Sequence, residues 1–158
     1  MDEAAFAAGM RRLAGGVALI TTQDATGRHG LVATAVTALS AAPPSLLVCV
    51  NRAASAHTAL AGAGVFCVNV LATAQEGLAA GFADPARRGE RFATGTWLHG
   101  MTGAPVLAEA LVTFECRVER VVEHGSHSVF MAAIAAIRHG SDAGEPLIYF
   151  NRGFRRLA

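Results

Sequence analysis

The sequence predicts a mainly β protein, a closed antiparallel barrel with a few short helices. Short runs rich in β-branched and aromatic residues recur along the chain, and glycine or proline separates them. Apolar and polar residues alternate most regularly over 112–118, as expected for a strand with one buried face. The helical segments between the strands are too few to supply the crossovers of a doubly wound parallel sheet, so the barrel is favoured.

The first elements are predicted to be a helix and then a hairpin. Residues 4–13 carry apolar side chains at helical spacing, Asp2 stands where it can cap the first turn, and Gly15–Gly16 is expected to end the helix. The β-branched run 17–22 predicts a strand. The polar, glycine-containing segment 23–30 is expected to be the loop of the hairpin.

The middle of the chain predicts three more strands and a helix. Segment 31–39 is the first of these strands, Pro43–Pro44 interrupts the chain, and 45–51 is a buried strand. A short helix is expected at 55–60 and a further strand at 65–71.

The last part of the chain is predicted to hold one helix, a long loop and three strands. A helix is expected at 75–82, and the arginine- and glycine-rich segment 84–103 is predicted to be a long irregular loop and a candidate lid. The alternation that starts at 112 is interrupted at Val121–Val122, which predicts a β-bulge. The final strands are expected at 128–138 and 147–150.

Composition limits the classes of function. The length of 158 residues fits one domain, residues 1–158, and 53% hydrophobic with 16% charged residues excludes a disordered chain. The mean hydropathy of +0.39 favours a buried oligomer interface. The net charge is +1 with no basic stripe, which argues against a nucleic-acid partner. All 13 basic residues are arginine, so Schiff-base lysine chemistry is excluded.

The cysteines and the N-terminus point to a cytoplasmic protein. Cys49, Cys67 and Cys116 lie far apart in apolar runs without a C-x-x-C motif, and we expect three reduced, buried thiols. The chain begins Met-Asp-Glu, and the apolar stretch after Arg11–Arg12 is interrupted at Gly15–Gly16. It is too short to span a membrane, so no membrane contact is expected.

A threonine-rich strand offers a surface for a flat ring. Thr34 and Thr37 are three residues apart, with small residues between them and after them. Backbone N–H groups and hydroxyls at such a strand can bind the polar edge of an isoalloxazine ring. An ordinary threonine-rich strand explains the same pattern, so the spacing alone leaves both interpretations open.

The next segment connects a strand that ends at Asn51 to a helix that begins near Ser55. The first N–H groups of a helix are unpaired and its dipole favours negative charge, so this helix start is a candidate phosphate site. Arg52 or His57 would contribute positive charge there. Ser55 as a plain N-cap explains the same residues.

His124 and His127 stand three residues apart in a His-Gly-Ser-His segment. On one strand an odd spacing places two side chains on opposite faces, so no metal site is expected. His127 is interpreted as a polar contact at a cleft, with a solvated histidine at a strand end as the alternative. No nucleophile–base motif is present, and hydride transfer between two bound cofactors needs positioning more than acid–base chemistry.

Several strings of residues match one family pattern in order and spacing. They include Ala33-Thr-Ala-Val-Thr-Ala-Leu-Ser40 and stand at 10–22, 33–51, 66–71, 91–92, 103–107, 114–116, 124–130 and 146–150. Together they resemble the flavin reductase-like family, the short-chain reductases that serve two-component monooxygenases. The resemblance covers nearly the whole chain and implies an antiparallel Greek-key split β-barrel that binds FMN.

The resemblance also implies roles for particular residues. The isoalloxazine ring would run along Thr34, Ala35, Val36 and Thr37, and the ring or ribityl chain would contact Ser40, Cys49, Val50 and Asn51. The phosphate end would be held by Ser55, His57 and Thr58. The remaining flavin contacts would come from Arg91, Phe92 and Tyr149, with the tail 152–156 closing the site. His127, in a segment similar to the family's Gly-Asp-Ser-His motif but without its aspartate, would contact the nicotinamide nucleotide.

The implied reaction is hydride transfer from NADH or NADPH to FMN, or to FAD, after which reduced flavin leaves for a partner oxygenase. Such barrels are typically homodimers with flavin near the interface. Two alternatives stay open: a flavin-dependent oxidase or reductase of the same fold that acts on another small molecule, and a non-enzymatic flavin carrier.

Overall fold

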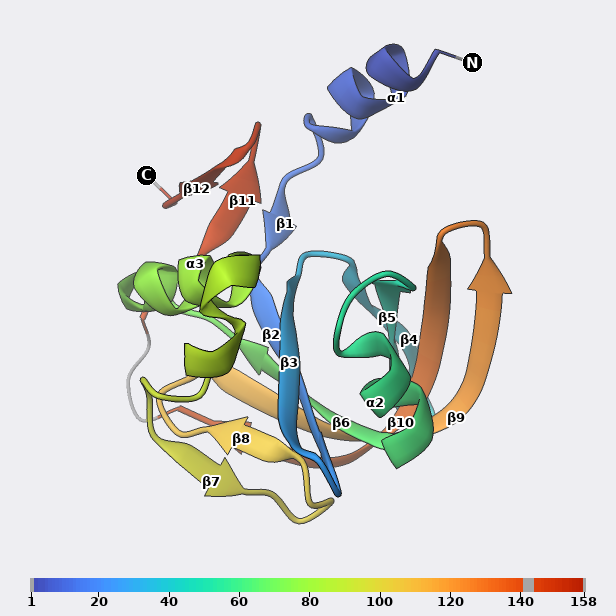
Figure 1. The fold of residues 1–158 in the computed structure, drawn as a ribbon, viewed down its shortest axis with the longest axis vertical. Helices are drawn as coiled ribbons and strands as arrows, with labels where there is room; N and C mark the ends of the chain where they lie inside the picture. The colour runs from blue at the N-terminus through green and yellow to red at the C-terminus, as the bar shows by residue number, and fades with distance from the viewer. Residues whose placement is uncertain (1, 141–143, 158) are drawn as a thin grey trace.

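The computed structural model describes residues 2–140 and 144–157 and is built mainly from β-strands, which confirms the expected fold class (Figure 1). Its helices and 3₁₀ turns are α1 (Glu3–Met10), α2 (His57–Ala63), η1 (Thr73–Gln75), α3 (Glu76–Ala83) and η2 (Pro85–Glu90). Its strands are β1 (Gly15–Gly16), β2 (Ala18–Asp24), β3 (Gly27–Ala33), β4 (Val36–Ala41), β5 (Pro44–Asn51), β6 (Val65–Val70), β7 (Trp97–His99), β8 (Pro105–Leu107), β9 (Val112–His124), β10 (His127–His139), β11 (Ile148–Phe150) and β12 (Gly153–Arg155). Among the described residues, no helix is long and apolar enough to cross a membrane.

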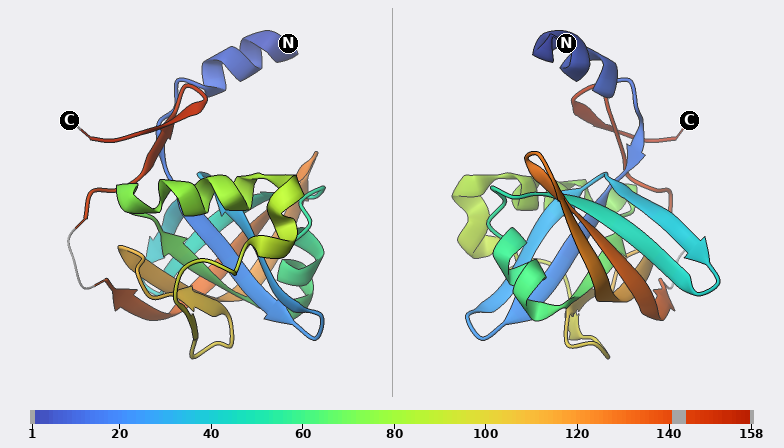
Figure 2. Two further views of the ribbon diagram at one scale, coloured as in Figure 1. Left: turned by 60° about the vertical axis from the view of Figure 1, so that its left-hand side comes forward. Right: turned by 90° about the vertical axis from the view of Figure 1, so that its right-hand side faces the viewer.

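The main sheet is antiparallel, with the strand order β3-β2-β6-β9-β10-β5-β4. Its two edge strands, β3 and β4, are separated in the sequence only by Thr34 and Ala35. A link of two residues spans at most about 11 Å, so the sheet is curled far enough to bring the end of β3 close to the start of β4 (Figures 1 and 2). Within the described residues no ladder joins β3 to β4. The expectation of a fully closed barrel is therefore wrong.

The main core fills the inside of this curled sheet. Alternate residues of each strand point inward, for example Val48 and Val50 on β5. The largest buried side chains there include Phe66 and Phe130, and α2 adds Leu60. The sheet therefore curls around a close-packed apolar interior.

A second core lies on the outer side of β2, where α3 and the β7–β8 hairpin cover the sheet (Figure 1). Leu19 points into this second core, while Ile20 points into the first, so β2 is buried on both faces. Phe82, Phe92 and Trp97 form an aromatic cluster here, with ring centroids 4.8–6.0 Å apart. This cluster fixes the segment after η2 against the sheet.

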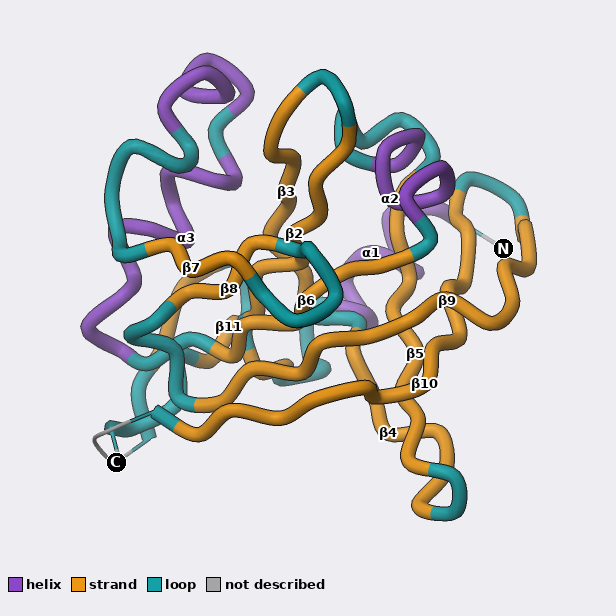
Figure 3. The backbone as a smooth tube through the Cα atoms, turned by 90° about the horizontal axis from the view of Figure 1, so that it is seen from below, coloured by secondary structure: helices purple, strands orange, loops and turns teal. Residues whose placement is uncertain are grey.

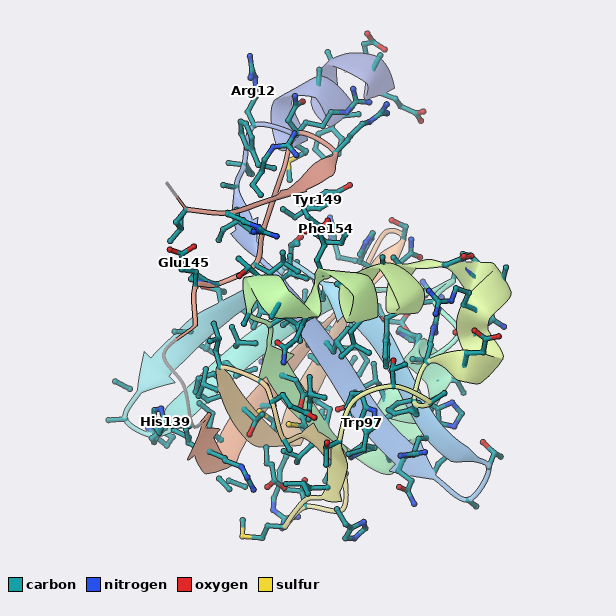
Figure 4. All side chains as sticks on the ribbon, turned by 90° about the vertical axis from the view of Figure 1, so that its left-hand side faces the viewer. Arg12, Trp97, His139, Glu145, Tyr149 and Phe154 are labelled. Carbon is teal, nitrogen blue, oxygen red and sulfur yellow. The ribbon has the colours of Figure 1, made fainter. Side chains whose placement is uncertain are left out.

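The two ends of the chain form an arm that extends from the sheet (Figures 1 and 4). β1 pairs with β11, and β11 pairs with β12. The Asp2 side chain accepts a hydrogen bond from the N–H of Ala4, which confirms the expected cap, although the helix ends at Met10 rather than at residue 13. α1 buries none of its residues, and Phe6 is 58% exposed.

Two predictions near the first hairpin are wrong. Segment 23–30 is mostly strand, because the turn between β2 and β3 contains only two residues. The Asp24 carboxylate stabilises this tight turn by accepting hydrogen bonds from the Thr26 hydroxyl and N–H and by pairing with His29. These contacts lower the pKa of Asp24 to about 2. The expected strand 31–39 is interrupted where the chain crosses from β3 to β4.

The second half of the chain brings two further corrections. Segment 84–103 is not irregular, because it contains η2 and β7, and β7 pairs with β8. A bulge is present on β9, but at Glu119, which has no partner opposite it, rather than at Val121–Val122. The three cysteines are unpaired as expected; Cys67 and Cys116 are buried, whereas Cys49 is half-buried.

Candidate functional site

The link Thr34–Ala35 lies beside the end of β5. The N–H of Cys49 donates a hydrogen bond of 3.0 Å to the carbonyl oxygen of Ala35. Two residues further along β5, Asn51 is directly opposite His127 on β10. The antiparallel ladder thus brings the segment expected to bind the flavin ring and the histidine expected to bind nicotinamide to one end of the sheet.

Thr34 is exposed and borders a cavity of about 230 Å³ on the side of the arm. Tyr149 and Phe154 form the opposite wall, with their ring centroids 5.7 Å apart (Figure 4). The predicted site residues Thr34 and Tyr149 are therefore brought together. The tail beyond Tyr149 forms the turn and second strand of the β11–β12 hairpin, and Asn151 and Arg152 adopt positive φ values at that turn.

A second, apolar cavity of about 260 Å³ opens into the interior of the curled sheet, and Val36 and Thr37 lie at its wall. Ser40 does not share this position. It is six residues from Thr34, about 20 Å along an extended strand, on the β4–β5 hairpin that projects from the sheet (Figure 3). The Ser40 hydroxyl accepts a hydrogen bond from the N–H of Ala42 at the hairpin turn. Its predicted contact with flavin is not supported by the geometry of a single chain.

A third cavity, of about 250 Å³, contains the predicted residues Ser55, Arg91 and Phe92. The expectation that Ser55 caps the helix is wrong, because α2 begins at His57 with Ala56 as an N-cap that makes no side-chain hydrogen bond. Instead, Arg91 Nη1 donates to the carbonyl oxygen of Gly30 at 2.9 Å and reaches Ser55 Oγ at 3.4 Å.

The same cavity is strongly basic, and part of its charge was not anticipated. Arg28 and Arg88 line it together with Arg91. The Arg28 guanidinium carbon lies 4.9 Å from the centroid of the Phe92 ring. Burial, and then the like charge of Arg88, lower the pKa of Arg91. In the described part of the chain, the buried Nε of Arg91 has no hydrogen-bond partner.

His57 and Thr58 are not part of this cavity wall. His57 is half-buried; its Nε2 hydrogen-bonds with the Ser128 hydroxyl at 2.8 Å, and its ring meets Phe130 edge-on at 5.6 Å. Thr58 is exposed on the next position of α2. These contacts direct His57 toward the sheet, so the geometry gives its predicted phosphate contact no support.

His127 is exposed at the turn between β9 and β10, with Nδ1 2.8 Å from the Ser126 hydroxyl. The assumption that His124 and His127 belong to one strand is wrong, because a two-residue turn separates them and they pair directly. Directly opposite residues project from the same face of a sheet. Among residues 2–140 and 144–157 there is no group of three or more His, Cys, Asp or Glu side chains that could hold a metal ion.

Comparison with known proteins decides the family. Residues 10–158 match the family model described as the flavin reductase like domain. The chain belongs to the flavin reductase-like family. It is 46% identical over 157 residues to "FMN reductase (NADH) RutF 1" of Methylorubrum extorquens, an alignment that covers 99% of this chain and 78% of that protein.

Solved structures of the flavin reductase-like family superpose closely on this one. The Streptomyces globisporus NADH:FAD oxidoreductase SgcE6, solved with NAD and FAD fragments, gives a TM-score of 0.91 at 30% identity and covers 99% of this chain and 93% of its own. BorF, the flavin reductase component of a bacterial two-component tryptophan halogenase, gives 0.90 at 33% identity, with coverage of 99% and 98%.

The residues of this flavin reductase-like domain fit a flavin nucleotide. The basic cavity offers an unpartnered buried donor and a hydroxyl, which suit a phosphate group. Thr34 is four residues from Gly30 along β3, about 13 Å at the rise of a strand, so a ring at the link and a phosphate at the cavity would be joined by an extended chain. Arg28 and Arg88 were missed because 23–30 was interpreted as a loop and 84–103 as an irregular lid.

Proposed function

We propose that this protein is an NADH-dependent FMN reductase that supplies reduced flavin to a partner oxygenase. The observation that carries the proposal is the combination of three features: the exposed link at Thr34, His127 on the strand that pairs with β5 beside this link, and the basic cavity around Arg91, which lies along β3 from the link. The names of the relatives, an NADH-dependent FMN reductase and the reductase component of a halogenase, support the same reaction.

A bound flavin would supply the hydride acceptor, with NADH as the donor, and would be released in its reduced form. The chain's own residues bind and orient the two reactants. The exposed residues Thr34 and Ala35 would meet the polar edge of the ring, and Arg91 and Ser55, which contact each other, would hold the phosphate. Because the reacting atoms belong to the cofactors, orientation is the protein's main contribution.

His127 is proposed to orient the nicotinamide. It stands on a turn that is fixed on one side by Arg52, whose N–H donates to the carbonyl oxygen of Ser126 at 2.9 Å. The Arg52 guanidinium also lies 3.5 Å from the Gly125 carbonyl oxygen and from the Glu123 carboxylate. A side chain on such a supported turn can hold one face of a ligand without taking part in proton transfer.

An anaerobic assay tests the activity directly. Purified protein with NADH and FMN is expected to oxidise NADH in proportion to added FMN, without oxygen. Absence of turnover would refute the reductase and favour the flavin carrier. Turnover that needs oxygen or another small molecule, and leaves no reduced flavin in solution, would favour the oxidase or alternative reductase. NADPH, FAD and riboflavin tested in parallel rank the co-substrates.

Replacement of His127 tests the nicotinamide site. His127→Ala is expected to raise the KM for NADH several-fold while FMN binding is retained, because one orienting contact is lost. His124→Ala is the matched control, since His124 is the directly paired residue across the same turn. An unchanged KM for NADH in His127→Ala, or an equal rise in both variants, contradicts the assigned role.

We also propose that the curled sheet is the split barrel of this family and that the protein is a homodimer. The exposed apolar side chains of α1, Phe6 and Met10, favour a second copy as their cover, because α1 buries no residue within one chain. Sedimentation analysis is expected to give twice the mass of the chain. A Phe6→Asp, Met10→Asp double variant is expected to shift this toward the monomer, and a wild-type monomer at micromolar concentration would refute the dimer.

A further inference from the structure

Three arginines from separate positions meet at the cavity of about 250 Å³ beside Ser55. Arg28 comes from β3, Arg88 from η2, and Arg91 from the residue that follows η2. Among residues 2–140 and 144–157, no carboxylate lines this cavity. The combination gives a concentrated positive charge in a chain whose overall charge is only +1.

This charge is not neutralised by ion pairs among the described residues. The nearby carboxylates are paired with residues other than these arginines: Glu90 with Arg87 at 3.4 Å, and Asp24 at 2.9 Å with His29, which also lines the cavity. No ion pair in the described ranges includes an arginine that lines the cavity. The pKa of Arg91 is lowered by burial and then by the like charge of Arg88, because both disfavour the charged form of its guanidinium. An anion bound in the cavity would relieve this repulsion.

The hydrogen-bonding groups of the cavity suit a phosphate that ends a chain. Arg91 Nε is buried and has no partner in the described structure, and Arg28 and Arg88 are exposed residues that line the cavity. Guanidinium groups match phosphate oxygens in paired hydrogen bonds. A phosphate monoester carries a charge of about −1.5 to −2 at pH 7, whereas a phosphate inside a diester has one ionised oxygen fewer.

We propose that Arg28 and Arg88, acting with Arg91, select flavins that end in a phosphate monoester. FMN is then preferred over riboflavin, which has no phosphate, and over FAD, whose phosphates are both esterified further. This inference rests on the proposed function, because it assumes that the ligand of the site is a flavin. It assigns the preference to two residues that are not part of the family pattern in the sequence.

Equilibrium binding to the full chain tests the proposal, with flavin fluorescence and equilibrium dialysis as readouts. The Arg28→Gln, Arg88→Gln double variant is expected to bind FMN about tenfold more weakly, which equals about 1.4 kcal/mol. Its affinity for riboflavin is expected to stay within twofold of the wild type, and its affinity for FAD to fall by a smaller factor than that for FMN. Raised salt is expected to weaken FMN binding in the wild type more than in the variant.

Arg87→Gln is the matched control. Arg87 is the sequence neighbour of Arg88, pairs with Glu90 and does not line the cavity, so its FMN affinity is expected to match the wild type. An unchanged FMN affinity in the double variant, an equal loss for FMN and riboflavin, or an equal loss for FMN and FAD overturns the proposal. A thermal melt identifies any general unfolding. NADH turnover by the double variant with saturating riboflavin separates failure of this inference from failure of the proposed function.

Discussion

Asn69 on β6 joins three strands through a fully buried side chain, and its removal should destabilise the fold measurably. Its Oδ1 accepts a hydrogen bond of 2.7 Å from the N–H of Leu107 on β8, and its Nδ2 donates to the Leu19 carbonyl at 3.1 Å and to the Thr21 hydroxyl at 2.9 Å. Asn69→Ala deprives buried groups of these partners, at about 1–3 kcal/mol for each group left unsatisfied. With three such groups each losing one partner, at the lower end of that range, we expect a loss of about 3 kcal/mol.

Thermal and urea unfolding measure this loss. For a domain of this size, 1 kcal/mol corresponds to about 2–4 °C, so the Tm of Asn69→Ala is expected to fall by about 6–12 °C. Asn51→Ala is the matched control, because Asn51 is exposed and makes one short-range contact, to the N–H of Ala53. Its Tm is expected to change by no more than about 2 °C. A Tm for Asn69→Ala within 2 °C of the wild type would refute the reasoning.

Three further predictions follow from single positions. Gly30→Ala places a methyl group 2.7 Å from a Phe82 ring carbon, so we expect a stability loss of about 1–3 kcal/mol and weaker FMN binding; unchanged urea unfolding would contradict it. The pKa of the Asp24 carboxyl is lowered to about 2, chiefly by its hydrogen bond from Thr26, so an NMR titration should place it well below the ordinary 3.8. The contribution of this turn to the stability of the fold is therefore present above pH 4 and is lost as the pH falls toward 2. A thiol reagent should label only Cys49 in the native protein, and FMN should slow that labelling; rapid labelling of all three thiols would contradict this.

Apolar residues recur with the period of a strand or helix when one face of the element is buried, so this periodicity is visible in the sequence. The start of the strand at 112–118 was placed well for this reason, and the helix expected at 75–82 lies within one residue of α3. The loop at 23–30 was misplaced because β3 begins with Gly27, Arg28 and His29, which are polar or small, and a two-residue turn leaves little signal. In the described structure β3 pairs only with β2 and β4 only with β5, and the lack of a ladder between β3 and β4 has no local signal, so the opening between them could not be predicted.

The site was predicted unevenly for a related reason. Residues adjacent in sequence, such as Thr34 and Ala35, were found together, and the fold then placed Asn51 and His127 near them through strand pairing. Charges that meet only in space were missed. Arg28 and Arg88 are 60 positions apart on two elements, and nothing local marks either one as part of a cavity.

The link Thr34–Ala35 explains why a binding site forms at this place in the fold. The N–H and C=O groups of a strand inside a sheet are hydrogen-bonded to its two neighbouring strands, so they are not free to bind a ligand. At the link the chain leaves one edge of the sheet and has just begun to join the other. In the described structure its backbone makes one backbone hydrogen bond, from Cys49 to Ala35, and both residues are exposed. A curled sheet that stays open therefore provides polar backbone beside an apolar interior, which is the combination that a flat ring with one polar edge requires.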